Sequence, residues 1–113
     1  MKIKLLFSTY FLLISVAFYS QNNEKAENLF AEAKKLINTD SRKAYQLLLD
    51  AKKNADKKNQ LVNDKIELSF AIIERINGNY KKSIQKTSEI LKKTNYIEVK
   101  ASAYNNLGAC YKN

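Results

Sequence analysis

Residues Ala101–Asn113 read ASAYNNLGACYKN, and within them Tyr104, Leu107, Gly108 and Tyr111 form the pattern Tyr-x2-Leu-Gly-x2-Tyr. Intervals of three and four residues bring side chains to one face of an α-helix. No Pro interrupts the passage. It therefore predicts a helix that runs to the end of the sequence.

Four more helical segments are predicted upstream of this last helix. The five expected ranges are residues 23–38, 41–58, 60–77, 80–94 and 97–113. The cluster Asn38-Thr39-Asp40-Ser41 is expected to cap the second helix and Asn79 the fourth, because a side-chain oxygen there can accept from free amides of the first turn. Gly78 allows the left-handed backbone that ends the third helix. Asn95 with Glu98 resembles a capping box at the start of the fifth.

The third segment differs from its neighbours because it carries two apolar stripes. One consists of Ile66, Phe70 and Ile73, and the other of Leu68, Ile72 and Ile76. A helix that is apolar on both flanks has to lie between neighbours, whereas the second and fourth segments are apolar on one side only. This alternation favours a helical-hairpin solenoid, although a generic helical bundle would show similar stripes.

The pattern in the last helix, with Tyr104 in the usual Trp place, resembles the first-helix signature of the tetratricopeptide (TPR) repeat. The corner Asn77–Tyr80 and the pair Ala44-x3-Leu48 are similar to other parts of that repeat. The resemblance covers about two and a half units within residues 21–113. It implies an all-α, TPR-like solenoid of about five antiparallel helices that binds protein or peptide.

The second unit departs from the family pattern. Ser83-x3-Thr87 replaces the small-x3-aromatic pair Ala-x3-Phe, and Glu74 stands where Tyr is usual. Asp40 and Asn79 lie 39 residues apart, compared with about 34 in a regular TPR array. We therefore expect a divergent repeat.

The resemblance also implies which residues face a binding groove. These are Lys65, Leu68, Ile72 and Arg75 in the second unit, and Ser102 and Asn105 in the third. Asn105 offers both a donor and an acceptor, and Arg75 offers a planar fork for a carboxylate. Leu68 and Ile72 could equally be core residues. Lys65 and Arg75 could equally lie on a solvated face.

Residues 1–20 have the features of a secretory signal peptide. Lys2 and Lys4 precede the apolar run Leu5–Tyr19, which is short for a membrane span of about twenty residues. We expect export to the periplasm or medium, with an uncleaved membrane anchor as the alternative. Without Lys2 and Lys4 the formal net charge falls from +9 to +7.

The basic charge does not favour a nucleic-acid partner. All basic residues except Arg42 and Arg75 are Lys, and many of them occur as adjacent pairs in the first, second and fourth predicted helices. Bidentate recognition of bases and phosphates is the property of Arg, and Lys pairs spread in this way are typical of a solvated helix face. An anionic membrane surface is the alternative partner.

No constellation for catalysis or metal binding is present in the sequence. There is no His, and Cys110 is the only thiol, so it has neither a base nor an internal disulfide partner. Carboxylate pairs such as Asp64/Glu67 have helical spacing and are expected to be solvated. We predict no enzyme, no cofactor and no metal site.

The main hypothesis is an exported TPR-like module that binds protein or peptide. Long exported TPR regions resemble the sensor parts of bacterial signalling proteins, so we expect an exported bacterial protein or the N-terminal portion of one. The sequence stops within its third unit, and either further sequence or a partner chain is expected to cover the last helix. The alternatives are a Lys-rich membrane-surface protein and a small structural protein that self-associates through its uncovered last helix.

Overall fold

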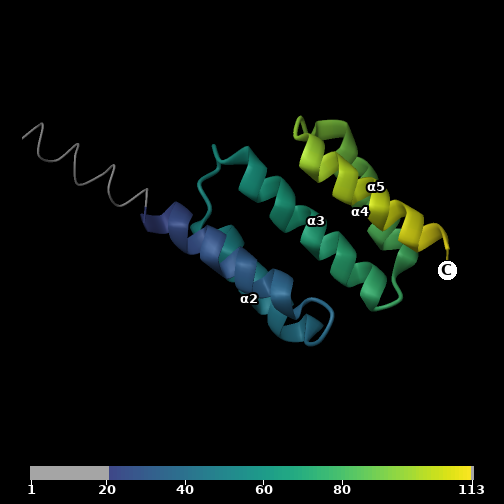
Figure 1. The fold of residues 1–113 in the computed structure, drawn as a ribbon, viewed down its shortest axis with the longest axis horizontal. Helices are drawn as coiled ribbons and strands as arrows, with labels where there is room; N and C mark the ends of the chain where they lie inside the picture. Colours follow the sequence, from purple (N-terminus) through teal and green to yellow (C-terminus); the bar gives the residue numbers. More distant parts are fainter. Residues whose placement is uncertain (1–20, 113) are drawn as a thin grey trace, which may run out of the picture.

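The computed structural model describes residues 21–112. These residues form five α-helices and no strand: residues 21–36, α2 (Ser41–Asn54), α3 (Gln60–Ile76), α4 (Tyr80–Lys93) and α5 (Ile97–Tyr111). Successive helices fold back on one another through short turns (Figure 1). The predicted all-α class is confirmed, and the predicted signal segment lies outside the described residues.

Within the described residues, no helix is long and apolar enough to cross a membrane.

Capping side chains and a glycine explain most of the helix boundaries. Asp40 Oδ1 accepts from the Lys43 amide at 3.1 Å and so caps α2. Asn59 Oδ1 accepts from the Val62 amide at 3.4 Å at the start of α3. Gly78 has a φ of 86°, the left-handed conformation expected after a helix. The predicted second, third and fourth helices start where expected, and α2 ends at Asn54 rather than residue 58.

Two of the predicted N-terminal caps, Asn79 and Asn95, do not form. Asn79 precedes α4 but makes no side-chain cap, because its amide Nδ2 donates to Glu74 Oε2 at 2.9 Å instead. Asn95 is not the cap of α5, since that helix begins after Tyr96. Thr94 Oγ1, one residue earlier than Asn95, accepts from the Tyr96 amide at 3.3 Å. A hydroxyl therefore organises this turn in place of the predicted capping box.

Helix α3 is the central element, as its two apolar stripes predict. It contacts α2, α4 and α5. Ile66, Phe70 and Ile73 belong to a core cluster with α2 and the helix over residues 21–36. Leu68 belongs to a second cluster with Val99 and Ala103 of α5. The same helix thus joins two hydrophobic clusters through opposite flanks.

Two small residues, Ala71 of α3 and Gly108 of α5, differ in their surroundings, and only Ala71 is buried. Its carbonyl accepts from the Ser83 hydroxyl of α4 at 2.6 Å. Gly108 is exposed, and a Cβ added to it would meet no atom within 4 Å. Gly108 therefore does not lie at a helix crossing within the described residues, and its backbone freedom lowers the stability of α5.

Gly108→Ala is expected to raise the free energy of unfolding by about 0.5–1 kcal/mol, because Ala restricts the unfolded chain and has the higher helix propensity. Urea denaturation followed by circular dichroism measures the change at low protein concentration. A decrease in stability would show that another element already occupies the space above Gly108.

Candidate functional site

A slot lies between the helix over residues 21–36, α3 and α5. Its volume is about 170 Å³. Five apolar residues line it (Phe30, Ile37, Leu68, Ile72 and Val99), together with five polar ones (Lys34, Lys65, Ser69, Glu98 and Ser102). The slot therefore has an apolar floor with polar groups around it, the usual composition of a site that orients a ligand by a few contacts.

The polar groups of the slot carry a net positive charge. Lys65 Nζ lies 3.3 Å from Glu98 Oε2, in an ion pair that is partly exposed to solvent. Lys34 forms no ion pair with any described residue. Because an exposed pair contributes only about 0–1 kcal/mol, Lys65 can exchange Glu98 for another carboxylate at little cost. Lys34 and Lys65 together suit an acidic group at the mouth of the slot.

The structure brings four of the six predicted groove residues together, namely Lys65, Leu68, Ile72 and Ser102. Lys65 and Ser102 both line the slot. Leu68 also lines it and is buried in the core cluster with α5, so its predicted groove and core roles coincide. Asn105 is exposed on α5 but does not line the slot. Arg75 does not line it either, because its Nε donates to Asn106 Oδ1 at 2.7 Å.

Asn106 is the centre of a buried polar network that joins three helices. It lies on α5 and accepts from Arg75 of α3 through Oδ1. Its Nδ2 donates to Ser83 Oγ at 2.9 Å and to Thr87 Oγ1 at 3.0 Å, both on α4. All the hydrogen-bonding directions of the amide NH2 group are therefore used. The network fixes the position of α5 relative to α3 and α4.

The two hydroxyls in this network are also satisfied. Ser83 donates to the Ala71 carbonyl of α3, and Thr87 donates to the Ser83 carbonyl at 2.7 Å. The Cys110 thiol donates to Ser83 Oγ at 3.4 Å. Cys110 is thus a buried partner in the packing between α4 and α5.

Sequence reasoning did not identify Asn106, although one signal pointed to it. Ser83 and Thr87 stand where the family has Ala and Phe. Two hydroxyls that replace two apolar residues on a buried helix face require a polar partner on the facing helix. A search of α5 for an amide or carboxyl group on its buried face would have selected Asn106.

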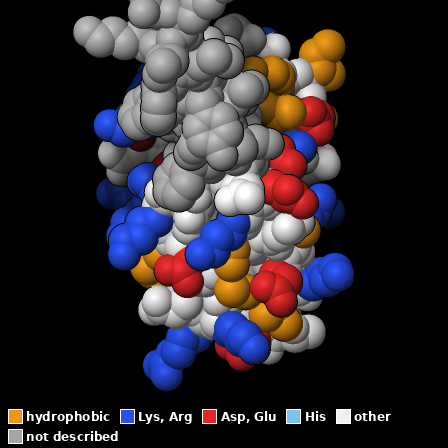
Figure 2. Space-filling view, turned by 90° about the vertical axis from the view of Figure 1, so that its left-hand side faces the viewer, with side chains coloured by type: hydrophobic (Ala, Val, Ile, Leu, Met, Phe, Trp, Pro, Cys, Tyr) orange, Lys and Arg blue, Asp and Glu red, His pale blue; other side chains and the backbone are white. Residues whose placement is uncertain are grey.

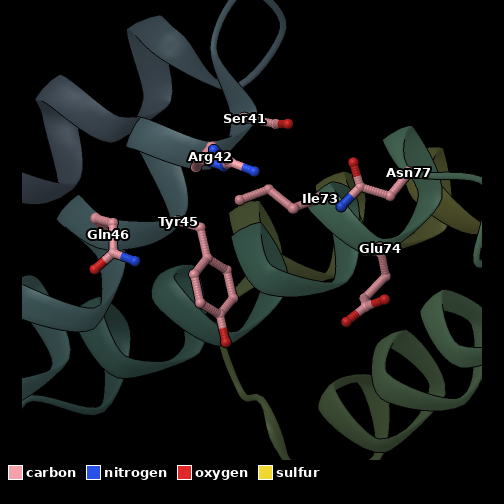
Figure 3. Close-up of a pocket in the computed structure, with 7 residues that line it drawn as sticks. All are labelled: Ser41, Arg42, Tyr45, Gln46, Ile73, Glu74 and Asn77. Atoms are coloured by element: carbon pink, nitrogen blue, oxygen red, sulfur yellow. The ribbon is translucent and has the colours of Figure 1, made fainter.

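A second hollow lies between α2 and the end of α3 (Figure 3). Its volume is about 470 Å³, and its lining residues are Ser41, Arg42, Tyr45 and Gln46 of α2, with Ile73, Glu74 and Asn77. The hydrogen bond from Asn79 and the Lys82 ammonium 3.4 Å away hold the pKa of Glu74 below its usual value. An ionised carboxylate with these partners is not a general acid at neutral pH.

Asp64 is buried, contrary to the expectation that its carboxylate is solvated. Only 7% of the residue is exposed, because α3 is covered along both flanks. Its Oδ1 accepts from Gln60 Nε2 at 2.8 Å, whereas Oδ2 has no hydrogen-bond partner. Among the described residues, no group of three His, Cys, Asp or Glu is placed to hold a metal ion.

Comparison with known proteins yields no matching family model, no matching curated protein and no matching solved structure.

Proposed function

We propose that the chain is an exported TPR-like module that binds an extended segment of a partner protein in the slot. The observation that carries the proposal is the position of the slot. It is lined by the first, third and fifth described helices, which are the helices that would line the concave surface of a helical-hairpin solenoid. Lys65 and Ser102, two of the residues implied by the TPR resemblance, are part of its lining. The leader in residues 1–20 supports export, and the proposal includes a place in a bacterial signalling protein.

The dimensions of the slot favour one side chain of a peptide over a small-molecule cofactor. Its volume is about 170 Å³, whereas sites for drug-sized ligands have about 300–1,000 Å³. Leu68 and Ile72 provide an apolar floor, and Lys34 and Lys65 provide positive charge. The segment that fits this surface carries an apolar side chain with an acidic residue beside it.

Two labelled octapeptides test this function directly with the full chain. One alternates Leu with Asp and the other alternates Leu with Lys. Fluorescence anisotropy is expected to show at least about tenfold tighter binding of the acidic peptide, a difference of about 1.4 kcal/mol. Lys34→Glu is expected to weaken that binding by a similar factor, because it reverses a charge at the slot.

Lys92→Glu provides the matched control. Lys92 is exposed on α4, outside the slot, and the substitution makes the same change in net charge. Binding by the control variant should stay within about twofold of the parent chain. Equal weakening by both substitutions would indicate non-specific attraction to a basic protein. Equal affinity for both peptides would remove the slot as the binding site.

The membrane-surface alternative has less support from the distribution of charge. On the face drawn in Figure 2, Lys and Arg side chains are interspersed with Asp and Glu and with apolar patches. A mixed surface attracts anionic lipid less than a continuous basic face does. The peptide-binding proposal is therefore preferred.

A further inference from the structure

Helix α5 carries a stripe of exposed apolar and small residues along its whole length. The stripe consists of Ile97, Ala101, Tyr104, Gly108 and Tyr111, at intervals of four, three, four and three residues. Ile97 is 83% exposed, Tyr104 63% and Tyr111 73%. The α5 stripe thus has the heptad spacing of a seam that packs against another helix.

The packing of α5 against the rest of the chain does not use this stripe. The inward face of α5 buries Val99, Ala103, Asn106 and Cys110. No described residue lies within 4 Å of the position that a Cβ on Gly108 would occupy. Space for the close approach of another helix is therefore open at the middle of the stripe.

We propose that a second copy of this chain covers the α5 stripe, with the two α5 helices antiparallel. Large and small residues alternate along the stripe. When two such stripes run in opposite directions, the large residues of one copy can lie against the small residues of the other. When Tyr104 lies over Gly108 of the second copy, Tyr111 lies over Ala101 of that copy. A parallel arrangement would instead set Tyr104 against Tyr104 and Gly108 against Gly108, which leaves the small residues unfilled.

The charges beside the stripe favour the same orientation. Glu98, Asn105 and Lys112 follow one another at intervals of seven residues along one flank. In the antiparallel register that sets Tyr104 over Gly108, Glu98 lies on the flank that faces Lys112 of the second copy, offset from it by about 3 Å along the helix axis. Opposite charges therefore face each other across this flank in the antiparallel pair.

The exposed area is sufficient for a weak dimer. Burial of a large side chain such as Tyr removes about 150–250 Å² from water, so the exposed parts of Tyr104 and Tyr111 amount to about 300 Å² per copy. A pair of copies then buries about 600 Å² from these residues and somewhat more with the flanks, in the range of weak and transient interfaces. We expect a dissociation constant in the high micromolar range.

Sedimentation equilibrium of the full chain over about 10–500 µM tests the proposal. The parent chain is expected to dimerise, and Tyr104→Glu is expected to raise the dissociation constant at least about tenfold, because it places a charge inside the seam. Gln85→Glu makes the same charge change on the exposed side of α4 and should leave the constant unchanged. A monomeric parent chain would overturn the proposal, and so would association that persists in Tyr104→Glu, including association through residues 1–20.

Disulfide formation tests the orientation in the full chain. Tyr104→Cys and Gly108→Cys variants are mixed under mild oxidation, with Cys110 buried and out of reach. The antiparallel pair predicts the mixed disulfide between the two variants. Predominant disulfides of each variant with itself would contradict the proposed orientation, and no disulfide beyond that of a Gln85→Cys control would contradict the interface.

Discussion

Asn106→Ala is expected to lower the free energy of unfolding by about 2–3 kcal/mol, since it removes an amide that makes three buried hydrogen bonds. Ser83 and Thr87 keep their own donated bonds to backbone carbonyls, so each loses only an accepted bond. Arg75 loses its acceptor on α5. Urea denaturation followed by circular dichroism measures the difference.

Asn105→Ala is the matched control for this substitution. Asn105 is the preceding residue on α5 and is exposed. Its replacement should change stability by less than about 0.5 kcal/mol, because surface substitutions away from specific contacts have small effects. Helix propensity alone would favour Ala over Asn at both positions, so similar losses for the two variants would contradict a specific contribution from the network.

Replacing the centre of the buried polar network with apolar side chains should recover much of the unfolding free energy that is lost when Asn106 alone is replaced. The triple substitution Asn106→Leu, Ser83→Ala and Thr87→Val removes donors and acceptors together, so fewer polar groups are left unpaired. It should be more stable than Asn106→Leu alone. A further loss on adding the two α4 substitutions would contradict the pairing of these side chains in the folded protein.

The helices themselves could be predicted because the chain marks its turns with local chemistry. Asp40, Asn59 and Gly78 act within three or four residues of the backbone groups that they satisfy, so their effect is visible in sequence. The central position of α3 was also predictable, because an apolar residue on each flank needs a neighbour on each side. Asn95 was assigned wrongly because Thr94, the adjacent residue, offers a competing acceptor.

The slot and the network were predicted less completely because they depend on how distant helices rotate against one another. Ser102 and Asn105 differ by less than one helical turn, yet only Ser102 lines the slot. Arg75 and Asn106 are 31 residues apart, and neither has a local feature that identifies the other. A polar residue at a buried helix position looks the same in sequence as one at a solvated position, until the facing residues are known.

Leu48→Ala is expected to cost about 3 kcal/mol of unfolding free energy, within the range of about 2–5 kcal/mol for a fully buried Leu. Leu48 is 0% exposed in the first core cluster, between α2 and its neighbours. Total stability of a small domain is about 5–15 kcal/mol, so the loss is a large fraction of it. Leu49→Ala is the control, because Leu49 is the adjacent residue and is 38% exposed. It should cost less than about 1 kcal/mol.

Leu48→Ala and Asn106→Ala should also differ in which helices they destabilise. Helix α2 contacts α3 but neither α4 nor α5, whereas Asn106 joins α5 to α3 and α4. Leu48→Ala should therefore speed amide hydrogen exchange most in residues 21–54, and Asn106→Ala should speed it most in α4 and α5. Helix α3 belongs to both clusters and should be the last element to exchange in either variant. Uniform acceleration along the whole chain in both variants would show instead that the two clusters unfold as one cooperative unit. In that case α3 would transmit the loss of either cluster to the other, and a ligand in the slot, which spans both clusters, would protect all five helices equally.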